Sequence, residues 1–240
     1  MALIAVLLFS APFIGGLIAI STGYKNEKIL NIFLAFAGGY IFSITILHLL
    51  PEIFAEHDNS SAIIVLAGFF FQVLVTRLTD GAEHGHLHVH KHEHNMVFPI
   101  GLFLSMCIHS FTEGIPLGFM GTENGINQPL SIGIALHEMP AAFALLSILQ
   151  SEHIKKKTVW LLLFIYAFMA PSGMLISSTL IQFLPEYFFT KILSFVAGIF
   201  LFISTTILFE NSENHQFSGK KLFAIAGGVL LAIGVSKLTH

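Results

Sequence analysis

Charged side chains are scarce in this chain of 240 residues, where Asp, Glu, Lys and Arg together make up 10% and the mean hydropathy is +0.81. Soluble domains carry about 25% charged residues, so the composition excludes an ordinary soluble protein and is typical of an integral membrane protein. The formal net charge of −3 provides no basic excess for nucleic acid, and we expect no nucleic-acid partner.

Cysteine and phosphate-binding motifs are also rare or missing. Cys107 is the single cysteine, which excludes an intrachain disulfide and a metal cage of several thiolates, and we interpret it as a small packing residue. No P-loop pattern occurs, so the chain does not itself hydrolyse ATP. The first apolar segment has no Lys or Arg before it and is too long for a signal-peptide core, which favours a retained first helix.

Long apolar segments, in contrast, fill most of the sequence. A window of about 20 residues, the length that spans a bilayer, finds them at roughly 2–22, 30–50, 60–78, 97–120, 128–150, 158–182, 189–209 and 220–236. Backbone groups in lipid must be satisfied within the segment, and the alternation of a barrel strand is missing. The sequence therefore predicts an all-α integral membrane protein with eight transmembrane helices.

The basic residues predict the orientation of these helices. Nine of the eleven would fall on one side of the membrane, and only Lys191 and Lys237 on the other. The nine are Lys25, Lys28, Arg77, Lys91, Lys155, Lys156, Lys157, Lys220 and Lys221. Because basic loops stay in the cytoplasm, we expect both termini outside the cell.

Residues 80–96, between the third and fourth segments, alternate histidine with other residues. The histidines are His84, His86, His88, His90, His92 and His94. Such a tract is typical of loose binding of zinc or similar ions, and a neutral polar linker is the alternative. The predicted orientation places this loop in the cytoplasm.

The fourth and fifth segments carry ionisable residues where spanning helices normally have none. His109 and Glu113 are four residues apart and share one helix face, while His137 and Glu138 are adjacent. Each such group costs at least about 2.5 kcal/mol at bilayer depth, so a functional site is the default interpretation. Imidazole and carboxylate ligands suit Zn²⁺, Fe²⁺, Mn²⁺ or Co²⁺, whereas a sulfur ligand from Met106 or Cys107 is less favoured.

Two prolines, three glycines and several alanines accompany these residues. Pro116 and Pro140 would free the carbonyls of Thr112 and Leu136, so we expect both helices to break beside the ligands. Small residues permit close helix approach, and we expect the two helices to touch through them. These are Gly114, Gly118 and Gly121 on one helix and Ala141, Ala142 and Ala144 on the other.

Three motifs together resemble the ZIP family of divalent-metal transporters. They are His-x-x-x-Glu-Gly from His109, His-Glu-x-Pro from His137, and Gly39 followed by His48-Leu-Leu-Pro-Glu52. The resemblance covers essentially the whole chain and implies a single transporter domain over residues 1–240. It also implies a carrier that moves zinc, iron or manganese toward the cytosol by an elevator-like or alternating-access mechanism. By this resemblance, His109, Glu113 and His137 would hold the main ion, with Ser110 and Glu138 facing a second position.

Three departures from the family pattern concern that second position. The helix 5 motif usually continues Pro-Glu-Gly, but Pro140 is followed by two alanines. Helix 6 usually offers Glu-Pro, where this chain has Ala170-Pro171, and Ser110 replaces a frequent Asn. We therefore predict one well-held ion, neutralised by Glu113 and Glu138, in place of two.

A loose internal symmetry favours a carrier built from inverted repeats. The second and seventh segments each run from a glycine, Gly39 or Gly198, to an acid, Glu52 or Glu210. Helices 1–3 and 6–8 would then surround the central helices 4 and 5 in a 3+2+3 arrangement. His48 with Glu52 at the outer mouth, and Glu210 at the inner mouth, are candidate ligands where ions enter or leave. Solvated residues at helix ends are the alternative.

Two other functions remain open from the sequence. An intramembrane zinc hydrolase would also use a zinc-bound water beside a carboxylate, although the His-Glu-x-x-His pattern fails at Ala141. A metal-sensing receptor without flux is the other. We expect no catalytic residues and no cofactor, with Zn²⁺, or Fe²⁺ or Mn²⁺, as the substrate and the lipid bilayer as surroundings. The short loops favour a bacterial inner membrane, and the formation of a homodimer is left open.

Overall fold

The computed structural model describes residues 1–22, 27–55, 59–79, 97–119, 127–152, 154–185, 187–209 and 219–239. Within these ranges the backbone is helical apart from short connections, and no strand occurs. The described residues contain eight helical spans that are long and apolar enough to cross a membrane. The prediction of an all-α membrane protein with eight spans is confirmed.

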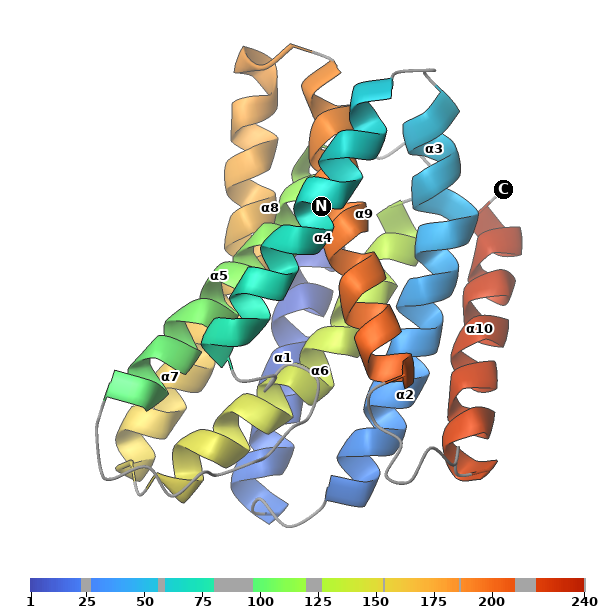
Figure 1. Cartoon of the computed structure of the whole chain (residues 1–240). Coiled ribbons are helices and arrows are strands. Elements are labelled where there is room, and N and C mark those ends of the chain that lie inside the picture. Colours follow the sequence, from blue (N-terminus) through green and yellow to red (C-terminus); the bar gives the residue numbers. More distant parts are fainter. Residues whose placement is uncertain are drawn as a thin grey trace.

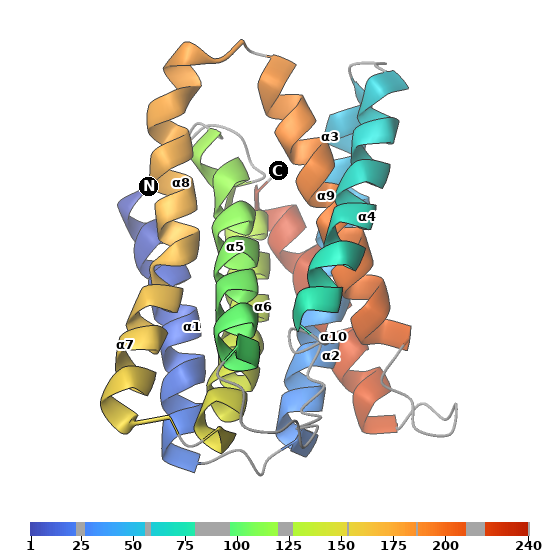
Figure 2. The same ribbon diagram turned by 60° about the vertical axis from the view of Figure 1, so that its left-hand side comes forward.

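Six of the eight described spans are single helices and two are composite, and Figure 1 shows how the helices are arranged in the bundle. The helices are α1 Ala2–Thr22, α2 Glu27–Ile44, α3 Leu50–Ala55, α4 Asn59–Thr79, α5 Val97–Phe119, α6 Asn127–Ser151, α7 Lys156–Ala167, α8 Met169–Leu180, α9 Tyr187–Phe209 and α10 Gly219–Thr239. The π-helical turn η1, Thr45–Leu49, joins α2 to α3, and the 3₁₀ turn η3, Ile181–Phe183, follows α8. The start of α1 and the end of α10 both lie in the upper half of the bundle (Figure 2).

The helix breaks differ from those that we expected. α5 and α6 continue through Pro116 and Pro140, so the expectation of breaks there is wrong. The sixth span is interrupted instead, because Pro171 has no N–H to donate to the carbonyl of Ala167, where α7 ends. The second span widens to a π-helical turn at Thr45, whose side-chain hydroxyl donates to the carbonyl of Ile41 at 2.8 Å.

Glycines at helix crossings allow four pairs of helices to pack tightly. The pairs are α1 with α6, α5 with α8, α2 with α10, and α4 with α9. At each crossing, a Cβ added to a glycine would collide with backbone atoms of the partner helix. Only glycine permits such an approach without a shift of the backbone.

The collisions occur in matched sets, which reveals the inverted repeat. Gly39 on α2 faces the Ile225 carbonyl on α10, and Gly198 on α9 faces the Val65 carbonyl on α4. These two contacts exchange when the second span is replaced by the seventh and the eighth span by the third. Such matching is expected of two structurally equivalent halves.

Two further matched sets complete this correspondence. Gly228 on α10 faces the Phe36 carbonyl, as Gly68 on α4 faces the Phe195 carbonyl. Where the outer helices meet the central ones, Gly15 on α1 faces the carbonyl of Met139 on α6, and Gly173 on α8 faces the carbonyl of Phe111 on α5. The first three spans therefore correspond to the last three spans, and the two central helices α5 and α6 correspond to each other.

Candidate metal centre

Three ionisable side chains meet between the two central helices. His109 and Glu113 project from α5 and His137 projects from α6, each offering a ligand atom within 4.8 Å of the other two. His109 Nε2 lies 3.2 Å from Glu113 Oε1, and the two imidazole rings have centroids 5.8 Å apart at an interplanar angle of 83°. Ligand atoms around a tetrahedral Zn²⁺ lie roughly 3.3 Å apart, so a small contraction of this cluster would surround one ion.

Burial of the central helices shields these groups from lipid. α6 is the most deeply buried of the described spans, with 83% of its apolar stretch buried. The second span, which contains α2, follows with 67%, and α5 is 61% buried. His109 is 2% exposed, while Glu113 and His137 are 0% exposed. A helix that is apolar around its whole circumference packs in the centre of a bundle, which is where the sequence pattern puts α6.

Glu138 lies beside the three-residue cluster and is not part of it, and Ser110 is the neighbour of His109 in the sequence. Both are 0% exposed, and Glu138 is close to Glu113 and to the hydroxyls of Ser110 and Tyr166. The expected metal site is thus divided: three residues converge, while Glu138 faces hydroxyl groups next to them. Cys107 is buried near Glu138 and does not belong to the cluster, and Met106 is also buried.

Tyr166 is the site residue that sequence reasoning missed. It is the last residue but one of α7, is 0% exposed, and lies near both Glu138 and Glu113. One signal could have revealed it: a tyrosine in the middle of a spanning segment, four residues before the position where we noted Ala170 in place of an acid. A polar group at that depth requires a partner in the protein.

The expected small-residue contacts are formed with other partners. Gly114 and Gly118 face the backbone of α8, and Gly173 of α8 faces α5 in return. α5 and α6 do contact each other, as expected, but the closest partner of α5 is α8 and that of α6 is α1. Gly121 lies outside the described residues.

Of the candidate residues at the two mouths, the structure describes His48 and Glu52, and neither belongs to this cluster. His48 is 5% exposed and lies in η1, which packs against α9, so its side chain is buried. Glu52 is exposed on α3. Glu210 and the six histidines of residues 80–96 lie outside the described residues.

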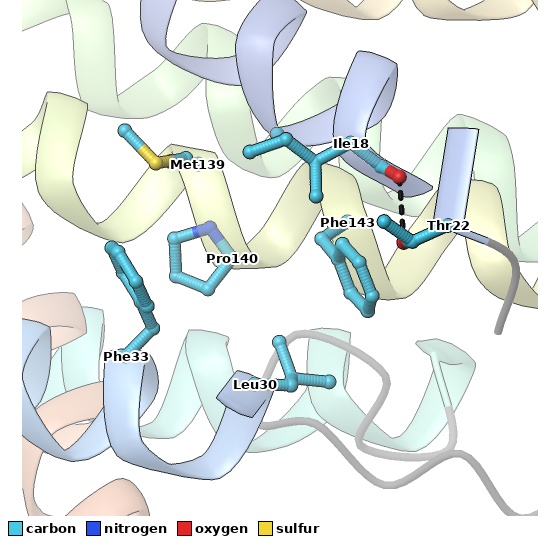
Figure 3. A pocket seen from close by; sticks show the side chains of 8 residues that line it. Ile18, Thr22, Leu30, Phe33, Met139, Pro140 and Phe143 are labelled. Carbon is cyan, nitrogen blue, oxygen red and sulfur yellow. Dashed lines mark hydrogen bonds between the residues drawn. The ribbon is translucent and has the colours of Figure 1, made fainter. Parts of the chain in front are cut away.

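An apolar cavity lies where α1, α2 and α6 meet. Its volume is about 120 Å³. Figure 3 shows Met139, Pro140 and Phe143 of α6 on one side and Leu30 and Phe33 of α2 on the other. Met139 and Pro140, which line this cavity, directly follow Glu138 in α6.

The donor set fixes the chemistry that the cluster can support. Two imidazoles and one carboxylate suit a divalent transition metal, and three protein ligands leave a coordination position open. A closed set of four would favour permanent structural binding. The arrangement is therefore suited to an ion that binds and leaves.

Comparison with known proteins agrees with this chemistry. Residues 72–236 match the family described as ZIP zinc transporter. The protein named zinc transporter ZIP9-B of Xenopus laevis is 26% identical over 188 residues, which cover 72% of this chain and 61% of the frog protein. The zinc transporter ZupT of Lysinibacillus sphaericus is 25% identical over 249 residues, 90% of this chain and 88% of its own length.

An uncharacterized protein of Methanocaldococcus jannaschii matches over a similar extent. It is 25% identical over 250 residues, which cover 96% of this chain and 94% of that protein. The chain thus spans about three fifths of the length of the frog ZIP9-B protein, but most of the length of the two microbial proteins.

Proposed function

We propose that this chain, which belongs to the ZIP zinc transporter family, carries divalent transition-metal ions across a membrane toward the cytosol. Zn²⁺ is the first candidate, with Fe²⁺ and Mn²⁺ as further substrates. The observation that carries the proposal is the buried cluster of His109, Glu113 and His137 between the central helices. The family is one of transporters and not of enzymes, so the hydrolase alternative is set aside.

One ion occupies the cluster at a time in this proposal. His109, Glu113 and His137 bind it directly, and Glu138 supplies the second negative charge that a divalent ion needs in a buried site. Ala141 is buried at the position where a bridging acid would support a second ion, which favours a single site. Water fills the remaining coordination position and is exchanged when the ion leaves.

Movement of one group of helices past the other would expose this ion to each side in turn. The backbone collisions found for glycines lie within α1, α5, α6 and α8, or within α2, α4, α9 and α10. Figure 2 shows the first group on the left and the second on the right. Between the groups, Gly133 on α6 meets the ring of Tyr40 on α2, whose hydroxyl donates to the Pro129 carbonyl at 3.1 Å. Side-chain contacts can exchange during sliding more easily than interlocked backbones can.

The positive-inside bias supports an orientation with both termini outside, in a bacterial cytoplasmic membrane. The histidines of residues 80–96 would then bind metal loosely in the cytoplasm. His48 with Glu52 would act at the outer mouth and Glu210 at the inner one. A homodimer is compatible with this scheme and is not required by it.

Metal uptake into proteoliposomes tests the proposal. We expect Zn²⁺ flux by the native chain and its loss in Glu113→Gln and in His137→Ala. Ser147→Ala is the matched control, because Ser147 is a buried hydroxyl on α6 ten residues beyond His137. Tight zinc binding without flux by the native chain would favour the sensor alternative, and equal flux in all four proteins would place the metal path elsewhere.

A further inference from the structure

Two buried polar groups face each other next to the metal cluster. Glu138 on α6 and Tyr166 on α7 are both 0% exposed. The Tyr166 hydroxyl is a polar neighbour of the Glu138 carboxylate, and its oxygen and both carboxylate oxygens are buried without a hydrogen bond of good geometry to any described residue. A hydroxyl that donates to a buried carboxylate lowers the cost of burying both.

The inverted repeat provides an internal comparison for this pair. Gly15 corresponds to Gly173, so Leu8, seven residues before Gly15, corresponds to Tyr166, seven residues before Gly173. Met139 corresponds to Phe111 in the same way, so Ser110 corresponds to Glu138.

One half of the molecule thus has a carboxylate with a tyrosine, and the other half has a serine with a leucine. Leu8 is as fully buried as Tyr166, at 0% exposure, so an apolar side chain fills the equivalent position without a hydroxyl. The tyrosine hydroxyl occurs only in the half that has a carboxylate, Glu138, at this position of the repeat. Packing alone does not account for Tyr166.

We propose that Tyr166 is a positioning residue, whose hydroxyl donates to Glu138 and holds the carboxylate beside the three metal ligands without letting it join them. This inference rests on the proposed function. Held in this way, Glu138 neutralises the ion from a short distance and leaves the fourth coordination position open. Without Tyr166, the carboxylate is free to turn toward the ion and close that position, so the ion binds more tightly and leaves more slowly.

The test compares Tyr166→Phe with Tyr40→Phe. Tyr40 is the matched control because it is also 0% exposed, and its hydroxyl donates to the Pro129 carbonyl in the contact between α2 and α6. Zinc titration of the purified proteins in detergent gives Kd, and zinc uptake into proteoliposomes gives KM and the maximal rate. For Tyr166→Phe we expect Kd and KM to fall roughly tenfold, as for the loss of one hydrogen bond to a charged group, with a lower maximal rate. Tyr40→Phe is expected to leave Kd unchanged.

The same substitution in a Glu138→Gln background tests whether Tyr166 acts through that carboxylate. We expect Tyr166→Phe to change neither Kd nor KM once the charge is removed. An unchanged or weakened Kd in Tyr166→Phe, or an equal effect in both backgrounds, would overturn the role of Tyr166 while leaving the proposed function intact. Failure of the native chain to bind or carry zinc would instead refute the proposed function, and this inference with it.

Discussion

At the scale of single residues, the two halves of the metal cluster are similar in imidazoles and different in carboxylates. His109 and His137 occupy equivalent positions, two residues before Phe111 and Met139. Glu113 has Ala141 as its counterpart, and Ser110 has Glu138. The site therefore has two carboxylates, one per half, at positions that are not related by the repeat.

This asymmetry leads to a prediction about stoichiometry. Two carboxylates neutralise one divalent ion, and a second ion beside it would be repelled without a further acid. We expect one tightly bound Zn²⁺ per chain in the described bundle, measured by anomalous scattering from crystals, and none in Glu113→Gln. Two strongly scattering ions between α5 and α6 would contradict this prediction.

The same residues mark how far sequence reasoning reaches. His109 and Glu113 could be paired from the sequence because residues four apart share a helix face whatever surrounds the helix. The direction of Glu138 could not, because adjacent residues lie about 100° apart and only the packing of α7 shows which of them faces hydroxyls. The role of Tyr166 could be recognised only from the packed structure, because its neighbour Glu138 is on another helix.

At the scale of helices, small residues explain the pairing better than prolines do. The expected breaks at Pro116 and Pro140 do not occur, and both α5 and α6 continue through their prolines. The glycines were expected to join α5 to α6, but Gly114 and Gly118 join α5 to α8. A sequence shows that a helix can approach another closely and does not show which one.

The matched glycines give a prediction about stability. Gly68→Ala and Gly228→Ala each place a methyl group against a backbone carbonyl of the partner helix, Phe195 and Phe36 respectively. We expect each to destabilise the protein by about 1 to 3 kcal/mol, as overpacking of a tight contact does, and by similar amounts because the two contacts are equivalent. Thermal unfolding in detergent measures the effect.

Gly101→Ala is the control for these substitutions. Nothing lies within 4 Å of a Cβ added at Gly101, which is inside α5. Alanine there is expected to stabilise the helix by roughly 0.5 to 1 kcal/mol through its higher helix propensity. If Gly68→Ala and Gly228→Ala unfold at the same temperature as Gly101→Ala, the close approach of these helices is wrong.

At the scale of the whole molecule, the sequence predicts the number and the ends of the spans well. The limits of the eight apolar segments agree with the helices within a few residues, because lipid requires both apolar length and internal hydrogen bonds. The inverted repeat was visible only as a loose match between two segments. Its register became clear from glycine contacts between helices far apart in the sequence, such as Gly39 with Ile225.

Orientation is a prediction at this scale. Pro185, next to the connection between α8 and α9, and Lys156, at the start of α7, are both exposed and lie at opposite ends of the sixth span. We expect a cysteine at Pro185→Cys to react with a membrane-impermeant maleimide on intact cells and one at Lys156→Cys to react only after lysis. Cys107 is buried and provides a low background. The reverse pattern would place both termini in the cytoplasm.

Relative movement of the two helix groups can be tested by joining them covalently. A Cβ added to Gly133 on α6 would lie 3.9 Å from Cγ1 of Ile41 on α2, close enough for cysteines at the two positions to form a disulfide. In a Cys107→Ala background, we expect Ile41→Cys with Gly133→Cys to carry zinc when reduced and to lose flux on oxidation. The loss follows because the bond joins helices that must slide past each other.

A disulfide within one group is the matched comparison. Gly16 on α1 faces the Leu163 side chain on α7, which belongs to the same span as α8. Gly16→Cys with Leu163→Cys therefore joins two helices that would move together. Oxidation of this second pair should leave zinc flux unchanged, because the bond spans no moving boundary. Equal loss of flux in both pairs would show that the boundary lies elsewhere, and equal retention would show that α2 and α6 keep their relative position while the ion crosses.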